Sequence, residues 1–175
     1  MPSHLRIARF GSAPHPHRPT RAQLPHGAVA MPVHRSLIEP MARCYLACHG
    51  PADGGHDLLA ARIRMTVIFD GAYGSLSTTW SSCLGDGEEV WGMALVTFGS
   101  VWDGGLDCPF LADLFVHPDH RGHGLGRALL SASMARVAGD GADLMALTLR
   151  PDTSAEALHL YEALGFVDPD ERTEQ

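Results

Sequence analysis

Apolar residues recur along the second half of the chain with two different periods. Leu111–Val116 and Leu144–Leu149 are short and almost wholly apolar, which is typical of strands buried on both faces. Between them, apolar side chains recur every three or four residues, which predicts an amphipathic helix. The positions that set this helical period are Leu125, Leu129, Leu130, Met134 and Val137. The pattern therefore predicts a strand, a helix and a strand in succession.

The first half of the chain predicts two helices followed by two strands. After a capping residue at Ser36, the apolar positions of Leu37–Leu46 follow helical spacing. Leu58–Phe69 is a second helical segment. Leu76–Leu84 and Glu88–Phe98 are strand-like, and the Gly-Asp-Gly between them is a hairpin signal.

The C-terminal part predicts a short helix and the beginning of a last strand. Thr153 and Glu156 have the spacing of a capping box at a helix start. Gly165 closes the helix, and Phe166 and Val167 begin a strand. The helix presents on one face Ala157, Leu160, Tyr161 and Leu164. Only eight residues follow Val167, so the last strand is expected to be truncated.

Length and charge indicate one globular domain with a distinct N-terminal segment. The chain has 175 residues, 45% hydrophobic content and a net charge of -7. Residues 1–35 carry five arginines and no acid, whereas the other 140 carry eight arginines against 20 acids, a net of -12. We therefore divide the chain into a basic, Pro/His-rich extension (1–35) and a domain (36–175). Leu5–Phe10 would form a strand if it found a sheet edge.

The charge distribution and the apolar pattern exclude several partners. An acidic body argues against nucleic acid and suits a cationic amine. No apolar run approaches a membrane span and no signal-peptide pattern is present, so we expect a cytoplasmic protein without a membrane partner. Cys44 and Cys48, beside His49, lack the further ligands that a metal site needs, which favours buried free thiols and no metal.

The strand Leu111–Val116 leads into a glycine-rich turn at the start of the next helix. Residues 121–126 read Arg-Gly-His-Gly-Leu-Gly. Alternate glycines let the backbone bend tightly and bring several N–H groups to the mouth of the helix, where its dipole favours a phosphate or pyrophosphate. The chain contains no lysine, which excludes a P-loop, and Arg127 stands where a dinucleotide fingerprint needs its third glycine.

The order of these motifs resembles the GNAT superfamily of acetyl-CoA-dependent N-acetyltransferases. The resemblance covers about Glu88 to Val167 and depends on the Arg-x-x-Gly-x-Gly turn together with Leu-Tyr-Glu-Ala-Leu-Gly-Phe at residues 160–166. It implies an α/β GNAT fold, a mixed central β-sheet flanked by α-helices, with acetyl-CoA as co-substrate. The edge beside the truncated last strand is then covered by the N-terminal segment, covered by a second subunit in a homodimer, or open.

The resemblance also implies cofactor-binding residues. Backbone amides of the turn would bind the CoA pyrophosphate. Phe115 and Val116 would pair with the pantetheine amides where the sheet splays. Ser154 stands where many relatives place an asparagine that touches the cofactor. The residues of the turn are Arg121, Gly122, His123, Gly124, Leu125, Gly126 and Arg127.

Tyr161 and Asp113 are the candidate catalytic residues. Tyr161 matches the family tyrosine that points toward the thioester sulfur, where a phenol can protonate a thiolate; otherwise it is a core tyrosine. Asp113 is an acid in an apolar strand, which would orient the amine or accept its proton through water, or serve only structurally. His117 is a second candidate base, or a turn cap. Tyr73 and Asp70 are expected near the acceptor pocket.

The sequence therefore predicts an N-acetyltransferase that moves an acetyl group from acetyl-CoA to a primary amine by direct attack in a ternary complex. One alternative is an enzyme that acetylates peptides or proteins. Another is a module that binds acyl-CoA without turnover. Ala112 stands where polyamine acetyltransferases place an acid, which weakens a polyamine acceptor, and nothing in the sequence separates small amines from peptides.

Overall fold

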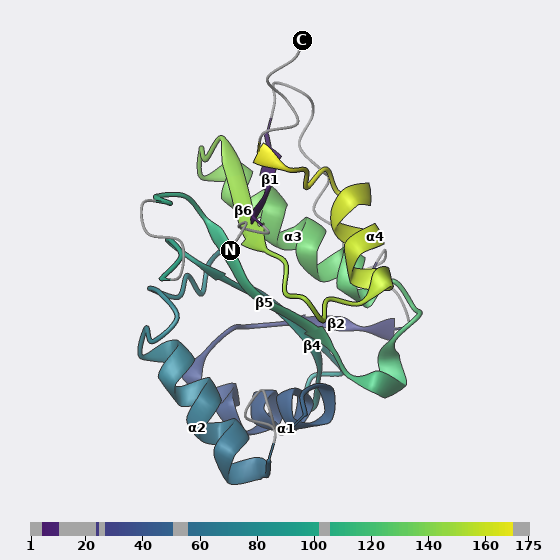
Figure 1. Cartoon of the computed structure of the whole chain (residues 1–175). Coiled ribbons are helices and arrows are strands. Elements are labelled where there is room, and N and C mark those ends of the chain that lie inside the picture. The colour runs from purple at the N-terminus through teal and green to yellow at the C-terminus, as the bar shows by residue number, and fades with distance from the viewer. Residues whose placement is uncertain (1–4, 11–23, 25–26, 51–55, 102–105, 170–175) are drawn as a thin grey trace.

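The described residues of this computed structural model, 5–10, 24, 27–50, 56–101 and 106–169, include a six-stranded sheet with helices on both faces (Figure 1). The strand order is β1-β6-β5-β4-β3-β2. The strands are β1 (Leu5–Arg9), β2 (Val29–Met31), β3 (Ser82–Gly85), β4 (Val90–Thr97), β5 (Phe110–Val116) and β6 (Leu144–Thr148). The β5–β6 pair is parallel and the other pairs are antiparallel, so the sheet is mixed, as the sequence predicted.

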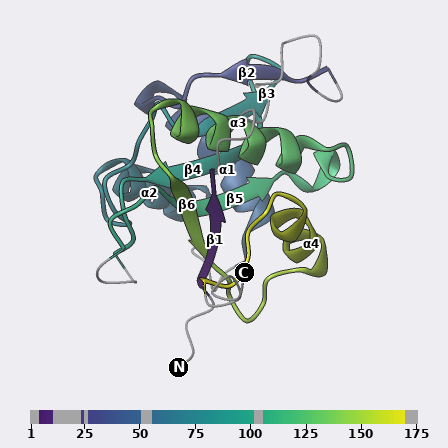
Figure 2. The same ribbon diagram turned by 90° about the horizontal axis from the view of Figure 1, so that it is seen from above.

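Helices α1 and α2 cover one face of the sheet, and α3 and α4 lie on the other (Figures 1 and 2). Their bounds are Ile38–Cys48 for α1, Leu58–Phe69 for α2, Leu125–Gly139 for α3 and Ala155–Ala163 for α4. Each side has its own apolar cluster against the sheet. No helix in the described part of the chain has the length and apolar content that a bilayer crossing requires.

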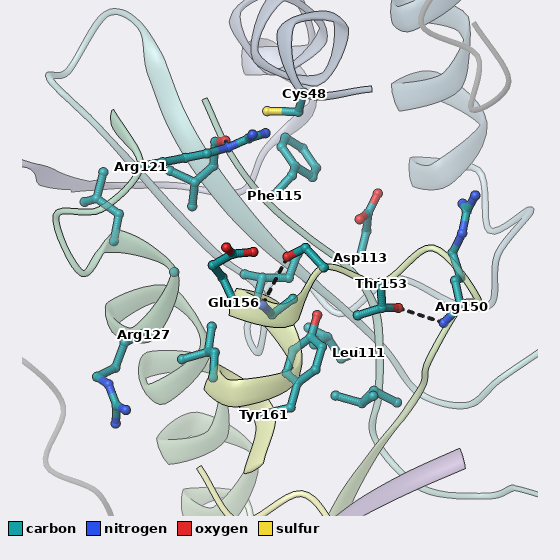
Figure 3. Close-up of a pocket in the computed structure, with 18 of the residues that line it drawn as sticks. Cys48, Leu111, Asp113, Phe115, Arg121, Arg127, Arg150, Thr153, Glu156 and Tyr161 are labelled. Atoms are coloured by element: carbon teal, nitrogen blue, oxygen red, sulfur yellow. Dashed lines mark hydrogen bonds between the residues drawn. The ribbon is translucent and has the colours of Figure 1, made fainter. Parts of the chain in front are cut away.

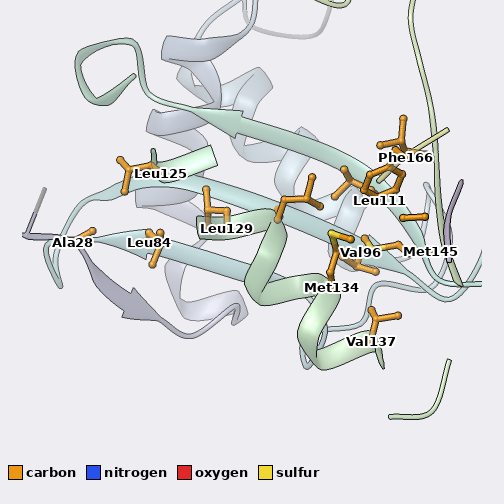
Figure 4. Packing of buried hydrophobic residues seen from close by; sticks show 14 residues of the cluster. Ala28, Leu84, Val96, Leu111, Leu125, Leu129, Met134, Val137, Met145 and Phe166 are labelled. Atoms are coloured by element: carbon orange, nitrogen blue, oxygen red, sulfur yellow. The ribbon is translucent and has the colours of Figure 1, made fainter. Parts of the chain in front are cut away.

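Helix α3 is held to the sheet by the apolar residues that set its predicted period (Figure 4). Leu125, Leu129 and Leu130 are almost completely buried, and Val137 is as well. They belong to one cluster with residues of five strands, among them Leu84, Val96, Leu111 and Met145. This packing fixes the first turn of α3 beside the C-terminal end of β5, and the predicted helix is confirmed.

The N-terminal strand β1 covers the outer edge of β6. Leu5 pairs with Thr148 and Arg9 with Leu144 in an antiparallel ladder. Ile7 also forms a bridge with Val167, where the predicted last strand is reduced to that one position in the described residues. Of the three ways to treat this edge, the structure shows cover by the N-terminal segment.

Three local predictions are wrong, each because a side-chain hydrogen bond competes with the regular backbone pattern. The His34 ring accepts from the Ser36 amide and begins a short 3-10 turn, so α1 starts at Ile38 and Ser36 is no cap. The predicted strand Leu76–Leu84 begins only at β3, because Ser77 and Ser81 form a turn in which the Ser81 hydroxyl donates to the Ser77 carbonyl at 2.6 Å.

The third wrong prediction concerns the cap of α4. The Ser154 hydroxyl accepts from the Ala157 amide at 3.2 Å, so Ser154 is the N-cap. Thr153, the predicted cap, instead accepts from the Arg150 amide at 2.9 Å through its hydroxyl. The predicted helix is correct and its capping residue is one position further on.

Strands β5 and β6 diverge after a single paired position. Phe110 pairs with Ala146, and no later residue of β5 has a partner on β6 among the described strand pairs. On its other side β5 keeps its register with β4 as far as Val116, but Ala112 is an extra residue between the Leu95–Asp113 and Val96–Leu111 pairs. Such a bulge bends the strand that carries it. The sheet therefore opens between β5 and β6, as the resemblance implied.

Candidate active site

A cavity of about 920 Å³ occupies the opening between β5 and β6. β5 forms one wall and the first turn of α4 forms another, with the loop before α3 at one end (Figure 3). Tyr161, Asp113 and every predicted cofactor-binding residue except His123 line this cavity. Those that line it are Asp113, Phe115, Val116, Arg121, Gly122, Gly124, Leu125, Gly126, Arg127, Ser154 and Tyr161.

The glycine turn places the first residues of α3 at the end of this cavity. Gly124 is the N-cap of α3, with φ of 78°, and Gly122 has φ of 76°. These values lie in the left-handed region that side chains with a Cβ rarely adopt. The first amides of a helix have no intrahelical partner, and the helix dipole adds positive potential there. The turn therefore presents backbone donors to the cavity.

Arg121 is held over the cavity by the strand that precedes the turn. Its Nε donates to the Val116 carbonyl at 2.9 Å, and in Figure 3 its guanidinium points toward Cys48. A hydrogen bond with Cys44 and the positive charge of Arg121 lower the pKa of Cys48 against the effect of burial. Arg127 is exposed and extends away from the other labelled residues. Arg121 is thus the better placed of the two guanidiniums to meet an anion in the cavity.

The backbone of β5 faces the cavity on the side where β6 has moved away. The His117 amide donates to the Trp91 carbonyl on β4 at 2.8 Å, so the backbone groups of Val116 and Leu114 point to the opposite side. The Val116 carbonyl accepts a hydrogen bond from Nε of Arg121. Leu114 is therefore one of the residues whose backbone faces the cavity. The sequence prediction named Phe115 instead, but its backbone faces β4 and its ring packs in the cluster beneath α1.

Tyr161 projects from α4 into the cavity near Leu111 (Figure 3). Its ring meets Phe166 edge-on, with 6.0 Å between the ring centroids. Burial, and then the negative charge of Asp113, raise the pKa of Tyr161 to about 12. At neutral pH this phenol keeps its proton and is a donor.

Asp113 lies across the cavity from α4 and faces the helix α1. Its carboxylate is 3.7 Å from Nε2 of His49, and the two side chains keep 28% and 17% of their surface exposed. Burial raises the pKa of Asp113, and the nearby charges of His49 and Arg64 partly oppose that effect. Asp113 is therefore a carboxyl group with an increased affinity for a proton at the wall of an open cavity.

His49 is a site residue that the sequence prediction missed. It follows the last residue of α1, and both its amide and its Nδ1 approach the Tyr45 carbonyl, at 3.0 and 3.1 Å. Its ring stacks on Tyr45, with 3.9 Å between centroids, and meets Phe115 edge-on. A carbonyl can only accept, so Nδ1 donates and Nε2 is directed to Asp113. Its position after Cys48 gave no signal, because the contact depends on the packing of α1 against β5.

His117 behaves as a turn cap, which was one of its two predicted roles. Its Nδ1 accepts from the Asp119 amide at 3.3 Å, and it is the N-cap of the 3-10 turn Pro118–His120. It does not line the cavity.

Among the described residues no group of three or more His, Cys, Asp or Glu side chains is arranged to hold a metal ion.

A second cavity of about 510 Å³ adjoins the first on the α2 side. Among the residues that line both cavities are His49, Asp113 and Arg150, so the two adjoin at Asp113. Tyr73 lines the second cavity, whereas Asp70 is exposed and pairs with Arg35. Its remaining lining residues are Tyr45, Arg64, Ile68, Leu95, Phe110, Leu111, Ala112, Thr148, Leu149 and Pro151. Its charged lining is therefore more basic than the acidic body of the chain suggested.

Comparison with known sequences gives a family for the second half of the chain. Residues 83–168 match the profile of the acetyltransferase (GNAT) domain. The chain is 43% identical over 54 residues to the L-amino acid N-acyltransferase MnaT of Escherichia coli (strain K12), a stretch that is 31% of either chain. It is 41% identical over 69 residues to the mycothiol acetyltransferase of Kocuria rhizophila, 38% of this chain and 22% of that one. The chain thus spans less than a third of the length of these curated relatives.

Solved structures with a similar fold include several acetyltransferases. The GCN5-related N-acetyltransferase from Sphaerobacter thermophilus has a TM-score of 0.64 at 14% identity, over 93% of this chain and 47% of that one. AAC(6')-Iy, solved with a bisubstrate analogue containing CoA, has a TM-score of 0.58 at 21% identity, over 81% of this chain and 91% of that one. At these identities the likeness concerns the fold, and it agrees with the predicted architecture.

Proposed function

Because residues 83–168 belong to the acetyltransferase (GNAT) family, we propose that this protein transfers an acetyl group from acetyl-CoA to a primary amine by direct attack in a ternary complex. One observation carries the proposal: a single cavity runs from the mouth of α3 to the Tyr161 side chain and on to Asp113. Such a cavity accommodates an anion at one end and acid–base chemistry at the other.

The residues around the cavity fit an acyl-CoA. The amides that follow Gly124, together with the Arg121 guanidinium, would hold the pyrophosphate. The outward-facing backbone of Leu114 and Val116 would pair with the pantetheine amides as a neighbouring strand does. Ser154 is the least suited of the proposed contacts, since its hydroxyl already accepts from α4.

The chemistry requires a proton donor on one side of the thioester and a proton acceptor on the other. As the amine nitrogen bonds to the acetyl carbon, the carbon–sulfur bond breaks and the thiolate leaves. Tyr161 donates its proton to that sulfur, because its raised pKa keeps the phenol protonated at neutral pH. Solvent then restores the phenol.

Asp113 and His49 together would accept the proton that the amine loses. The Tyr45 carbonyl fixes His49 Nδ1 as the donor, which leaves Nε2, 3.7 Å from the Asp113 carboxylate, to share a proton with it. A carboxyl group in this setting binds a proton more readily than one in water, because burial raises its pKa. The pair stands where the two cavities meet, which is where an amine from the second cavity would reach the thioester.

A thiol-release assay with acetyl-CoA tests the proposal across two acceptor panels, small primary amines and short peptides. We expect free CoA thiol above the hydrolysis background with at least one panel, and the panel that responds identifies the acceptor class. Saturable binding of acetyl-CoA with no thiol release from either panel would contradict catalysis and indicate a binding module.

A further inference from the structure

We propose that the amine acceptor carries a carboxylate beside its amine, as an amino acid does, and that Arg64 binds this carboxylate in the second cavity. The inference rests on the proposed acetyl transfer and names its substrate class. It depends on Arg64, which the sequence did not single out and which the mechanism does not use.

Arg64 is a cation of the second cavity that has no carboxylate within ion-pair distance, although its charge and that of Asp113 interact. It projects from α2, and its guanidinium lies over the Tyr73 ring, 4.3 Å from the centroid, with one terminal nitrogen hydrogen-bonded to the Tyr73 hydroxyl. Its Nε is buried and has no hydrogen-bond partner. Within the described residues no carboxylate approaches the guanidinium to 4 Å. By contrast Arg62, two residues earlier, pairs with Glu39 at 3.0 Å and is more than half exposed.

A half-buried guanidinium with an unsatisfied donor costs free energy unless an anion meets it. Tyr73 supplies a π face and one acceptor, but neither neutralises the charge. A ligand carboxylate would neutralise the charge and accept from the free Nε, because a guanidinium presents several donors that match two carboxylate oxygens. A guanidinium without a carboxylate in ion-pair contact and with an open Nε therefore points to an anionic group of the acceptor.

The other residues of the second cavity fit the rest of an amino acid. Asp113, with His49, lies at the junction with the first cavity, where it attracts an ammonium group and can take its proton. Most of the uncharged lining is apolar, and this wall suits an aliphatic or aromatic side chain: Ile68, Leu95, Phe110, Leu111, Leu149 and Pro151. The Asp113 carboxylate and the Arg64 guanidinium, at separate places in the lining, match the two charges of a zwitterion.

The same lining disfavours an amine with several positive charges. Two guanidiniums, those of Arg64 and Arg150, face the second cavity against one carboxylate. Arg150 is paired with Asp152, at 3.1 Å, and Arg64 has no such partner. A polycationic acceptor would bring further positive charge toward Arg64, and that repulsion is strongest where solvent is excluded. The charged residues that line this cavity are thus mainly basic, although the domain as a whole is acidic.

Matched pairs of acceptors test the carboxylate directly: leucine against 3-methylbutylamine, and phenylalanine against phenethylamine. The members of a pair differ only in the carboxylate. We expect the wild-type protein to acetylate the amino acid with at least about tenfold higher kcat/KM, since a charge-assisted bidentate contact supports a discrimination of that order. Equal or better turnover of the decarboxylated amine would overturn the proposal.

Arg64→Gln should lower kcat/KM for the amino acid about 10- to 100-fold more than for the decarboxylated amine, which feels only the effect of the lost charge on Asp113, and should leave the KM for acetyl-CoA almost unchanged. Arg62→Gln, on the same helix and outside both cavities, is the matched control and should change neither. Arg64→Gln that keeps the wild-type preference would refute the subsite.

Calorimetric titration of the CoA complex with leucine separates this proposal from the one on which it rests. Thiol release from amines without a preference for amino acids would refute the proposed Arg64 subsite and support the proposed acetyl transfer. No thiol release from any acceptor, together with leucine binding that Arg64→Gln abolishes, would keep the subsite and reject the catalysis. No leucine binding by the CoA complex and no turnover would reject both.

Discussion

Tyr161 is a proton donor at neutral pH because its surroundings oppose the phenolate. Burial and the nearby Asp113 charge both raise its pKa, to about 12. Asp113 in turn has a raised pKa, chiefly through burial. The two groups thus stand on opposite sides of one cavity with protonation tendencies that suit an acid and an acceptor.

The phenol at residue 161 should be needed for turnover and not for binding. Tyr161→Phe removes the donor and keeps the ring against Phe166. We expect kcat to fall by about 100-fold, with the KM for acetyl-CoA and the melting temperature close to wild type. Steady-state thiol release measures both constants, and a variant with wild-type kcat would show that another group protonates the thiolate.

Asp113 should reduce stability at high pH. Its native pKa lies above the ordinary value of 3.8, so the folded state binds its proton more tightly than the unfolded chain does. The unfolding free energy is therefore greatest below the ordinary value, and it decreases as pH rises toward the native pKa. Asp113→Asn lacks this dependence, and we expect it to melt above wild type at pH 8, with the difference vanishing near pH 4.

Thermal unfolding of both proteins from pH 4 to pH 8 measures this difference. The same variant should lose most of its acetyl transfer, because it cannot accept the amine proton. A variant that is less stable than wild type at pH 8 would show that the His49 contact outweighs the burial of the charge.

At the scale of elements, the hydrophobic periods predicted the helices correctly. Local side-chain hydrogen bonds made the predicted start of one strand and the predicted cap of one helix wrong. Helix α2 has the bounds that its pattern indicated, and α3 begins at the residue after Gly124. The strand expected from Leu76 starts six residues later, at Ser82, because serine hydroxyls close a turn that a hydrophobic pattern does not record. The cap of α4 moved by one residue for the same kind of reason.

The N-cap of α3 should tolerate only glycine without loss. Gly124 has φ of 78°, and an alanine there costs about 1 kcal/mol of stability or tilts the first turn. We expect Gly124→Ala to raise the KM for acetyl-CoA several-fold. Gly139→Ala, at the other end of α3, where an added Cβ would meet only open space, is the control and should leave this KM unchanged. An equal effect of both substitutions on this KM would show that acetyl-CoA does not bind at the N-terminus of α3.

At the scale of the whole molecule, β1 joins the two ends of the chain. Its partners on β6 and at Val167 lie about 140 and 160 residues away in sequence, so no local pattern identifies them. The sequence predicted a strand at Leu5–Phe10 that would need a sheet edge, and it offered cover by the N-terminal segment as one of three alternatives for the edge beside the last strand. His49 and Arg64 were missed for the same reason, since each meets its site through the packing of α1 and α2.

The contribution of β1 to stability is measurable at Ile7. This side chain is buried in a small cluster with Phe110 and Ala146. Ile7→Ala should lower the unfolding free energy by about 2–4 kcal/mol in urea titrations. Arg9→Ala, at the exposed end of the same strand, should change it by less than about 0.5 kcal/mol. Equal unfolding free energies for Ile7→Ala and wild type would mean that β1 is not part of the cooperative fold.

Amide hydrogen exchange with and without saturating acetyl-CoA tests the central claim most directly, because it reports where the co-substrate is held. The opening between β5 and β6 leaves backbone groups of Leu114 and Val116 without strand partners. The account predicts that acetyl-CoA slows exchange in peptides spanning residues 114–128, through the end of β5, the glycine turn and the first turn of α3. Saturated protein that shows protection elsewhere and none in this segment would contradict it.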